Sequence, residues 1–239
     1  MDMAGLALEA RLSVLRRAAA ARARHGSLAR AGLSLAIGLS LLAGAVILGA
    51  GSAWSKPPVR ILMLGDSITA GFGLPEAESL PRVLEAVLER AGHDVRVTNG
   101  GVSGDTTAGG LARVGWMLEE KPQIVVVELG ANDGLRGLEP KLSYDNLDKL
   151  LAILERAKLP VLLTGMLAPP NLGREYGQAF AAIYPALAKK YHCLLYPFLL
   201  EGVAAVPALN QADGIHPNAK GVAVIAQGLA PYVERLLGG

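Results

Sequence analysis

The sequence is poor in cysteine and in charge. Of its 239 residues only Cys193 is a cysteine, so no internal disulfide and no thiolate metal cluster is available. It has no His-Glu-x-x-His motif and no cluster of Cys and His, so we expect neither a metal nor a cofactor. Charged residues make 18% and hydrophobic residues 51% of the chain. This balance excludes disordered, collagen-like and acidic-tail proteins and predicts a sizeable core.

Most of the chain also lacks a basic excess. The formal net charge of +2 arises in residues 1–55, which hold six arginines against Asp2 and Glu9. The remaining 17 of the 23 basic residues and 19 of the 21 acidic residues lie in residues 56–239. A nucleic-acid-binding protein needs a basic face, so we expect no nucleic-acid partner.

One long hydrophobic run is present near the amino terminus. A basic region, residues 1–30, precedes residues 31–55, which contain no charged side chain. A basic region, an apolar run and then small residues is the order of a secretory signal. The run is also long enough to span a bilayer as a helix, although its five glycines weaken it as an anchor.

Residues 31–55 are therefore predicted to be a signal peptide or a transmembrane anchor. Either would place the rest of the chain outside the cytoplasm, in the periplasm or anchored to the inner membrane. If it is not cleaved, this segment is also the membrane contact. An organelle transit peptide in residues 1–30, or a translation start other than Met1, stays open as a third interpretation.

Downstream of Pro58, short aliphatic runs alternate with longer helical patterns, which is typical of βαβ units. The expected strands are residues 59–64, 94–98, 123–129, 160–165 and 193–198. The expected helices are residues 79–91, 107–120, 142–157, 174–191 and 219–236. Several strands are apolar without alternation, as in a parallel sheet covered on both faces. We therefore predict one α/β domain, residues 57–239, with three layers and a five-stranded parallel sheet.

Polar, glycine-rich segments follow four of the predicted strands. Ligands of such sheets bind outside the carboxyl ends of the strands, so these segments are expected to meet at one rim. They are residues 65–67, 99–105, 130–134 and 213–218.

Ser67 is the candidate nucleophile of this rim. A serine hydroxyl attacks poorly without a neighbouring base, and His216 is the one histidine of four that falls on the rim. Asp213 precedes His216 by three residues, and the intervening turn allows its carboxylate to reach the imidazole and fix the tautomer.

Three donors are candidates for binding an oxyanion. They are the backbone N–H of Ser67, the backbone N–H of Gly104 and the side-chain amide of Asn132. Each motif alone also reads as an ordinary turn, since glycine, Asn-Asp-Gly and Asp-x-x-His all occur in solvated loops. The presence of all four polar segments, in order and each after a strand, favours a catalytic interpretation.

These segments resemble the blocks of the SGNH (GDSL) hydrolase family. They read GDSITAGFGL with Ser67, GVSGDTTAGGLARV with Gly104, ELGANDGLRG with Asn132 and DGIHPN with Asp213 and His216. The likeness extends over residues 59–237 and is strongest to the exported bacterial acyl-CoA thioesterase, lysophospholipase and arylesterase group. Ile68 occupies the position of the leucine in the GDSL motif, an exchange of one apolar residue for another.

The resemblance implies a flavodoxin-like fold and a serine hydrolase. In it Ser67 is the nucleophile, His216 the general base and then acid, and Asp213 the residue that orients His216. The oxyanion hole consists of Ser67, Gly104 and Asn132. A Gly-x-Ser-x-Gly motif is absent around Ser67, which argues against the α/β-hydrolase superfamily.

The implied substrate is a small-molecule ester or thioester with an acyl chain. Apolar loops on the rim are expected to form its groove, with substrate contacts from Leu135, Arg136, Leu138, Met166 and Pro169. Arg136 would meet a phosphate or carboxylate, or stay solvated. Two alternatives stay open: a carbohydrate or aryl acetylesterase of the same family, and a ligand-binding module without turnover. The intact Ser67, Asp213 and His216 weigh against the second.

Overall fold

The computed structural model describes residues 57–238. The predicted basic region, residues 1–30, and the predicted signal peptide or anchor with its hydrophobic helix, residues 31–55, lie outside the described residues. Within residues 57–238 no helix has the length and apolar character that crossing a membrane requires.

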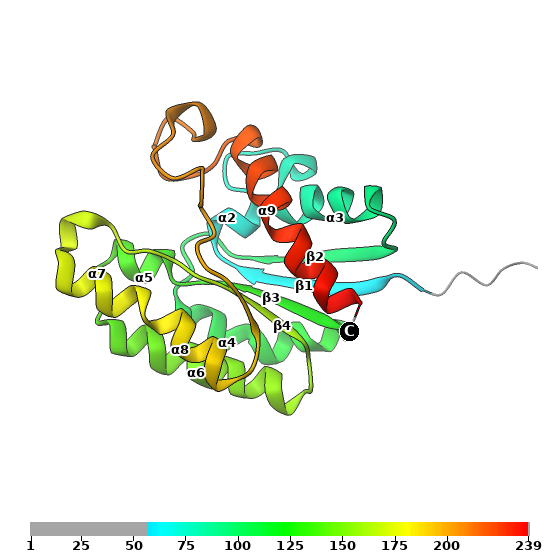
Figure 1. The fold of residues 1–239 in the computed structure, drawn as a ribbon, viewed down its shortest axis with the longest axis horizontal. Coiled ribbons are helices and arrows are strands. Elements are labelled where there is room, and N and C mark those ends of the chain that lie inside the picture. The colour runs from blue at the N-terminus through cyan, green and yellow to red at the C-terminus, as the bar shows by residue number, and fades with distance from the viewer. Residues whose placement is uncertain (1–56, 239) are drawn as a thin grey trace, which may run out of the picture. The chain divides into compact units, whose positions relative to one another are not determined.

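A five-stranded, all-parallel sheet forms the centre of the domain (Figure 1). Its strands are β1 (Val59–Gly65), β2 (Val95–Gly101), β3 (Ile124–Glu128), β4 (Val161–Thr164) and β5 (Leu194–Tyr196). They lie in the order β2-β1-β3-β4-β5 and confirm the predicted parallel sheet. In this doubly wound order successive strands are added on opposite sides of β1, and ligands of such sheets bind at the switch point between β1 and β3.

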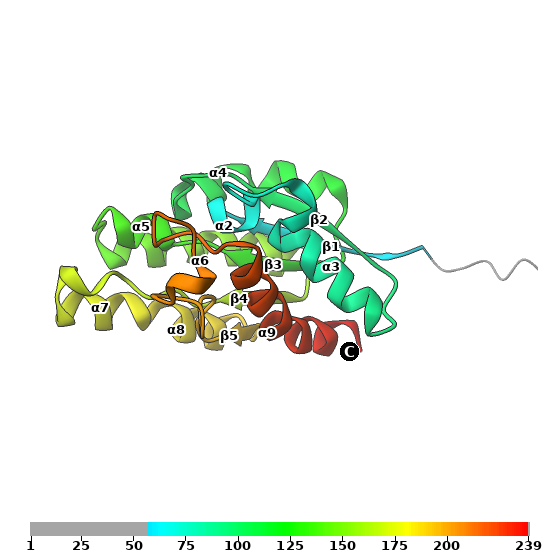
Figure 2. The ribbon, with the colours of Figure 1, turned by 90° about the horizontal axis from the view of Figure 1, so that it is seen from above.

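Helices cover both faces of the sheet, which gives three layers (Figures 1 and 2). One face carries α3 (Leu80–Arg90) and α9 (Ala219–Leu237), which pack against each other. The opposite face carries α4 (Thr107–Met117), α6 (Pro140–Arg156) and α8 (Ile183–Lys190). Because both faces are covered, residues 61–64 and 125–127 are 0% exposed, which explains why these strands do not alternate in polarity.

The predicted helix over residues 174–191 is wrong in one respect, because it is two helices. The structure has α7 (Arg174–Ala181), then a break at Ala182, then α8. Pro185 has no N–H to donate to the carbonyl of Ala181, and its ring crowds that carbonyl, so a continuous helix is unfavourable.

The structure has several short elements besides the predicted helices. Two are one-turn helices at the carboxyl ends of β1 and β3, namely α2 (Ser67–Ala70) and α5 (Ala131–Leu135). The others are 3-10 turns: η1 (Glu76–Glu78), η2 (Leu118–Glu120), η3 (Pro170–Leu172) and η4 (Pro207–Leu209).

The carboxyl ends of the central strands are level with one another. Gly65 at the end of β1 pairs with Gly101 on β2 and with Glu128 on β3. The segments that follow these strands therefore start from one edge, and this edge carries α2, α5 and the turn before α4.

Candidate active site

Ser67 is the first residue of α2 and is 9% exposed. The carboxylate of Asp66 caps this helix by accepting a hydrogen bond from the N–H of Ile68 at 3.0 Å. Gly65 precedes them in a crowded place, where a Cβ would overlap the side chains of Thr69 and Glu128. The strand-to-helix turn that presents Ser67 therefore requires glycine at position 65.

The structure brings Ser67, His216 and Asp213 into one hydrogen-bonded chain. His216 Nε2 lies 2.9 Å from Ser67 Oγ, and His216 Nδ1 lies 2.6 Å from Asp213 Oδ2. Asp213 Oδ1 accepts hydrogen bonds from the N–H groups of His216 and Ile215 at 3.0 and 2.9 Å. The backbone N–H of His216, then its imidazole, and then the N–H of Ile215 lower the pKa of Asp213 to about 2. Asp213 is therefore ionised throughout the neutral range.

Gln211 connects the loop of His216 to the segment after Ser67, a link that sequence reasoning missed. Its side-chain Nε2 donates to the carbonyls of Phe72 at 2.7 Å and Pro217 at 2.9 Å, and its backbone N–H donates to the carbonyl of His216. The ring of Phe72 lies against the imidazole of His216, with centroids 4.5 Å apart. A Cβ on Gly73 would overlap the Gln211 side chain. These contacts hold the imidazole toward Ser67.

Replacing Gln211 with glutamate should slow ester turnover about 10-fold, because two donors are lost and carboxylate oxygens face two carbonyls. The loss should lie in kcat rather than KM, since Gln211 acts on the orientation of His216. Steady-state kinetics on an aryl ester at pH 8 measures it. Gln178→Glu, on the exposed surface of α7, is the matched control. Equal kcat in both variants would contradict the role given to Gln211.

Two backbone N–H groups of the predicted oxyanion hole have no acceptor. Within residues 57–238 neither the N–H of Ser67 nor that of Gly104 donates a hydrogen bond. Gly104 has a φ of +85°, which favours glycine, and its carbonyl accepts from Arg136 Nη2 at 2.8 Å. Arg136, predicted to be solvated or to meet an anion, thus also fixes the loop of Gly104.

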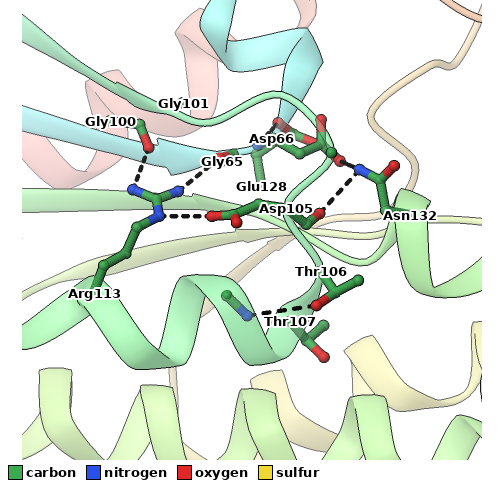
Figure 3. Close-up of polar contacts among 12 residues, drawn as sticks. Gly65, Asp66, Gly100, Gly101, Asp105, Thr106, Thr107, Arg113, Glu128 and Asn132 are labelled. Carbon is green, nitrogen blue, oxygen red and sulfur yellow. Dashed lines mark hydrogen bonds and ion pairs between the residues drawn. The ribbon is translucent and has the colours of Figure 1, made fainter.

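The third donor, the amide of Asn132, lies on α5 between two acceptors (Figure 3). Its Nδ2 is 2.9 Å from the carbonyl of Asp105 and 3.2 Å from Asp66 Oδ2. The structure therefore places Asn132 beside the turn that carries Ser67, as the predicted hole requires.

Arg113 fixes the strand ends below the site; it lies in the same sequence block as Gly104, but no role was predicted for it. Its guanidinium donates to the carbonyls of Gly65 at 2.8 Å and Gly100 at 2.7 Å, and pairs with Asp105 at 2.6 Å (Figure 3). One planar side chain thus joins β1, β2 and the loop that leads into α4.

A buried pair of carboxyl groups lies under α2. Glu128 and Asp66 are both 0% exposed, and Glu128 Oε2 accepts from the N–H of Asp66 at 3.1 Å and from Thr69 Oγ1 at 2.8 Å. Burial and the neighbouring Asp66 raise the pKa of Glu128 well above its usual range. Burial also raises the pKa of Asp66, to about 6, against the opposing effect of the Ile68 N–H. Both shifts disfavour two negative charges in this buried place, and Glu128 carries the added cost of the neighbouring Asp66 carboxylate.

Replacing Glu128 with glutamine should raise the midpoint of thermal unfolding at pH 8. The unfolded chain releases the Glu128 proton above pH 4.5 while the folded state holds it to higher pH, so wild-type stability falls as pH rises from there. Glutamine removes this cost and keeps an oxygen for Asp66 and Thr69. We expect a gain of several degrees, since 1 kcal/mol corresponds to roughly 2–4 °C in a domain of this size.

The gain should shrink toward pH 4, which scanning calorimetry across this range would show. Glu85→Gln is the contrasting variant: Glu85 is also buried, but it pairs with Arg82 and Arg96 at 3.0 and 3.2 Å. That substitution should destabilise the protein. A Glu128→Gln protein that is less stable at every pH would show that the carboxyl is ionised in the fold.

The predicted substrate contacts divide into rim residues and one core residue. Leu135 and Arg136 are exposed, and Leu138 and Pro169 are partly exposed. Met166 is 2% exposed and belongs to the core, so the prediction that it contacts substrate is wrong. It directly follows β4 and turns inward, whereas the next residue, Leu167, is 51% exposed.

The other reactive groups of the domain do not compete with Ser67. Burial raises the pKa of Cys193 to about 11, which keeps it a thiol rather than a nucleophilic thiolate. Among residues 57–238 no group of three or more His, Cys, Asp and Glu side chains is arranged to hold a metal ion.

Comparison with known proteins assigns the chain to a family. The GDSL-like Lipase/Acylhydrolase family profile matches residues 63–224. An arylesterase of Vibrio mimicus is 40% identical over 187 residues, which cover 78% of this chain and 94% of the relative. The Thioesterase 1/protease 1/lysophospholipase L1 of Escherichia coli is 39% identical over 178 residues, 74% of this chain and 84% of the relative. The crystal structure of AlinE4, an SGNH-hydrolase family esterase, is 47% identical and superposes with a TM-score of 0.65, covering 77% of this chain and 98% of AlinE4. The chain belongs to the GDSL-like lipase and acylhydrolase family, the SGNH hydrolases.

Proposed function

We propose that the protein is a serine hydrolase of carboxylic esters and thioesters, of the arylesterase, acyl-CoA thioesterase and lysophospholipase type. One observation carries this proposal. The Asp213, His216 and Ser67 side chains form a continuous hydrogen-bonded chain beside two backbone N–H groups that have no acceptor within residues 57–238. A nucleophile, its base and donors for an oxyanion are the groups that acyl transfer requires.

The reaction has two steps. In the first, Ser67 Oγ attacks the acyl carbon while His216 Nε2 takes its proton, and the carbonyl oxygen becomes an oxyanion held by Ser67, Gly104 and Asn132. The carbonyl re-forms as the alcohol or thiol leaves with the proton from His216, and the acyl group stays on Ser67. In the second, water attacks the acyl-serine with the same base, and a carboxylic acid is released.

An acyl or aryl substrate suits the side chains around Ser67. Exposed apolar side chains lie on segments that follow the strand ends: Phe72, Leu135, Leu167 and Ile215 are 50%, 48%, 51% and 48% exposed. Exposed apolar side chains near a site favour contact with an apolar part of a ligand. The relatives named as an arylesterase and as a thioesterase and lysophospholipase support the same substrate class.

A substrate panel on the purified protein tests the function. The panel holds aryl esters from acetyl to long acyl chains, acyl-CoA thioesters and lysophospholipids, and a serine-reactive phosphonate labels the nucleophile. Turnover with a preference for medium or long chains, and an adduct on Ser67, is expected. A strong preference for acetyl esters would instead indicate an acetylesterase, and no turnover with no adduct would indicate a binding module.

Export is part of the proposal and is supported by the sequence of residues 1–55 alone. Expression of the full chain in a bacterium, followed by fractionation and determination of the mature amino terminus, tests it. A periplasmic protein that begins near residue 56 indicates a cleaved signal, and an intact chain in the membrane fraction indicates an anchor. Intact protein in the cytoplasm contradicts export.

A further inference from the structure

Asp66 is a buried carboxylate next to the nucleophile that the proposed reaction does not use. Its two oxygens have different partners: Oδ1 accepts from the N–H of Ile68 at 3.0 Å, and Oδ2 faces Asn132 Nδ2 at 3.2 Å. One carboxyl group thus joins the helical turn of Ser67 to the side chain of Asn132, across 66 positions in the sequence (Figure 3).

Asp66 is itself held from below. Glu128 Oε2 accepts from its backbone N–H at 3.1 Å, and Thr69 donates to the same oxygen at 2.8 Å. The backbone of Asp66 is therefore tied to β3, the strand that leads into α5.

The three oxyanion donors differ in how they are fixed. The N–H groups of Ser67 and Gly104 belong to the backbone, so the fold itself sets their directions. The Asn132 amide lies at the end of two rotatable bonds and is directed only by its acceptors, the carbonyl of Asp105 at 2.9 Å and Asp66 Oδ2. Without Asp66 as acceptor, the amide plane of Asn132 can turn about its hydrogen bond to the Asp105 carbonyl.

We propose that Asp66 is a positioning residue: it keeps one N–H of the Asn132 amide in place while the other N–H leaves the Asp105 carbonyl and binds the oxyanion beside Ser67. The inference rests on the proposed function and deepens it. Asp66 acts through Asn132, so its contribution disappears when the Asn132 amide is absent.

Several charged or titratable groups surround Asp66. They are Glu128 on β3, His216 in the loop before α9, Arg113 on α4 with its partner Asp105, and Tyr184 on α8. Burial raises the pKa of Asp66 to about 6, so at pH 8 its carboxylate is ionised and accepts from Asn132. Kinetic measurements are therefore made at pH 8.

A double-mutant cycle between Asp66→Asn and Asn132→Ala tests the inference. Asparagine at position 66 keeps an oxygen for the N–H of Ile68 and places a second amide donor against Asn132. Alone it should lower kcat on an aryl ester about 10- to 100-fold with little change in KM, less than the roughly 10²- to 10³-fold loss for a deleted oxyanion donor, because the Asn132 amide is misplaced and not removed. In the Asn132→Ala background it should lower kcat by less than about 3-fold. The same fold loss in both backgrounds overturns the inference.

Asp66→Ser provides a second variant for the same cycle if Asp66→Asn does not fold. Serine retains a capping oxygen for Ile68 but is too short to reach Asn132, so the same non-additivity is expected. Asp148→Asn, a carboxylate on α6 that pairs with Lys190 far from β1, is the control with unchanged kcat.

A measurement without substrate separates this inference from the proposed function. The side-chain amide signal of Asn132 in a nitrogen-15 NMR spectrum, assigned by its absence in Asn132→Ala, should shift with pH around a midpoint near 6. The shift should vanish in Asp66→Asn. A signal that does not respond to pH overturns the inference, whereas wild-type protein that turns over no ester overturns the proposed function.

Discussion

Replacing Ser67 with alanine should lower kcat/KM on an activated ester about 10⁴- to 10⁶-fold. The substitution removes the oxygen that forms the acyl-enzyme bond, and no neighbouring side chain replaces it, since Cys193 remains a thiol at a pKa of about 11. The residual rate comes from the oxyanion donors and from substrate binding, which stay in place. Initial rates with a p-nitrophenyl ester measure the loss.

Labelling with the phosphonate provides a second readout of the same variant. Wild-type protein should gain one adduct by mass spectrometry and Ser67→Ala none. Ser103→Ala is the matched control, because Ser103 is exposed and one residue from Gly104; its rate should stay within about twofold of wild type. A Ser67→Ala protein with wild-type rate and an adduct elsewhere would show that another residue is the nucleophile.

The second large effect concerns Asp213. Asp213→Asn should lower kcat about 10⁴-fold, the loss that the equivalent change causes in a well-studied Ser-His-Asp triad. The carboxylate requires the proton of His216 to lie on Nδ1, which leaves Nε2 free to accept the proton of Ser67. An amide nitrogen facing Nδ1 favours the opposite tautomer, and the base is lost although the geometry is kept.

The pH dependence distinguishes this role from general charge loss. Because the pKa of Asp213 is about 2, its carboxylate stays ionised down to strongly acidic pH. Titration of Asp213 itself should thus add no inflection to the pH profile of wild-type kcat from pH 6 to 9. Asp145→Asn, in a surface pair with Lys141 at 2.6 Å, should stay within about twofold of wild type. An Asp213→Asn enzyme that retains a tenth of wild-type kcat would exclude Asp213 as the orienting residue.

The fold could be predicted from local hydrophobic patterns in the sequence. The apolar runs that became β1 and β3 are continuous because both faces of the sheet are covered, and this can be read without knowing which helix covers which face. The same patterns placed Ser67, Gly104, Asn132 and His216 after strands, and the parallel sheet then brought them to one edge. Proline inside an apolar helical pattern was the signal available for the break at Ala182.

Contacts between distant parts of the chain could not be predicted from local sequence patterns. Arg113 reaches Gly65 across 48 positions, and Gln211 reaches Phe72 across 139, and neither lies in a spacing that marks its partner. Glu128 ends an apolar strand, so its sequence context gives no hint that it is buried beside Asp66 and accepts from the Asp66 backbone N–H. Met166 follows a strand as the rim residues do, and only the direction of its side chain separates it from them.

The level ends of β1, β2 and β3 have a practical consequence for handling the enzyme. The chain enters β1 at Val59, at the amino edge of the sheet, whereas Ser67 stands beyond the carboxyl edge at the far end of the same strand. A support or fusion partner joined directly ahead of Pro57 is thus attached opposite Ser67, the proposed nucleophile. Immobilising the domain through that end leaves substrates in solution, or at an interface, an open approach to Ser67.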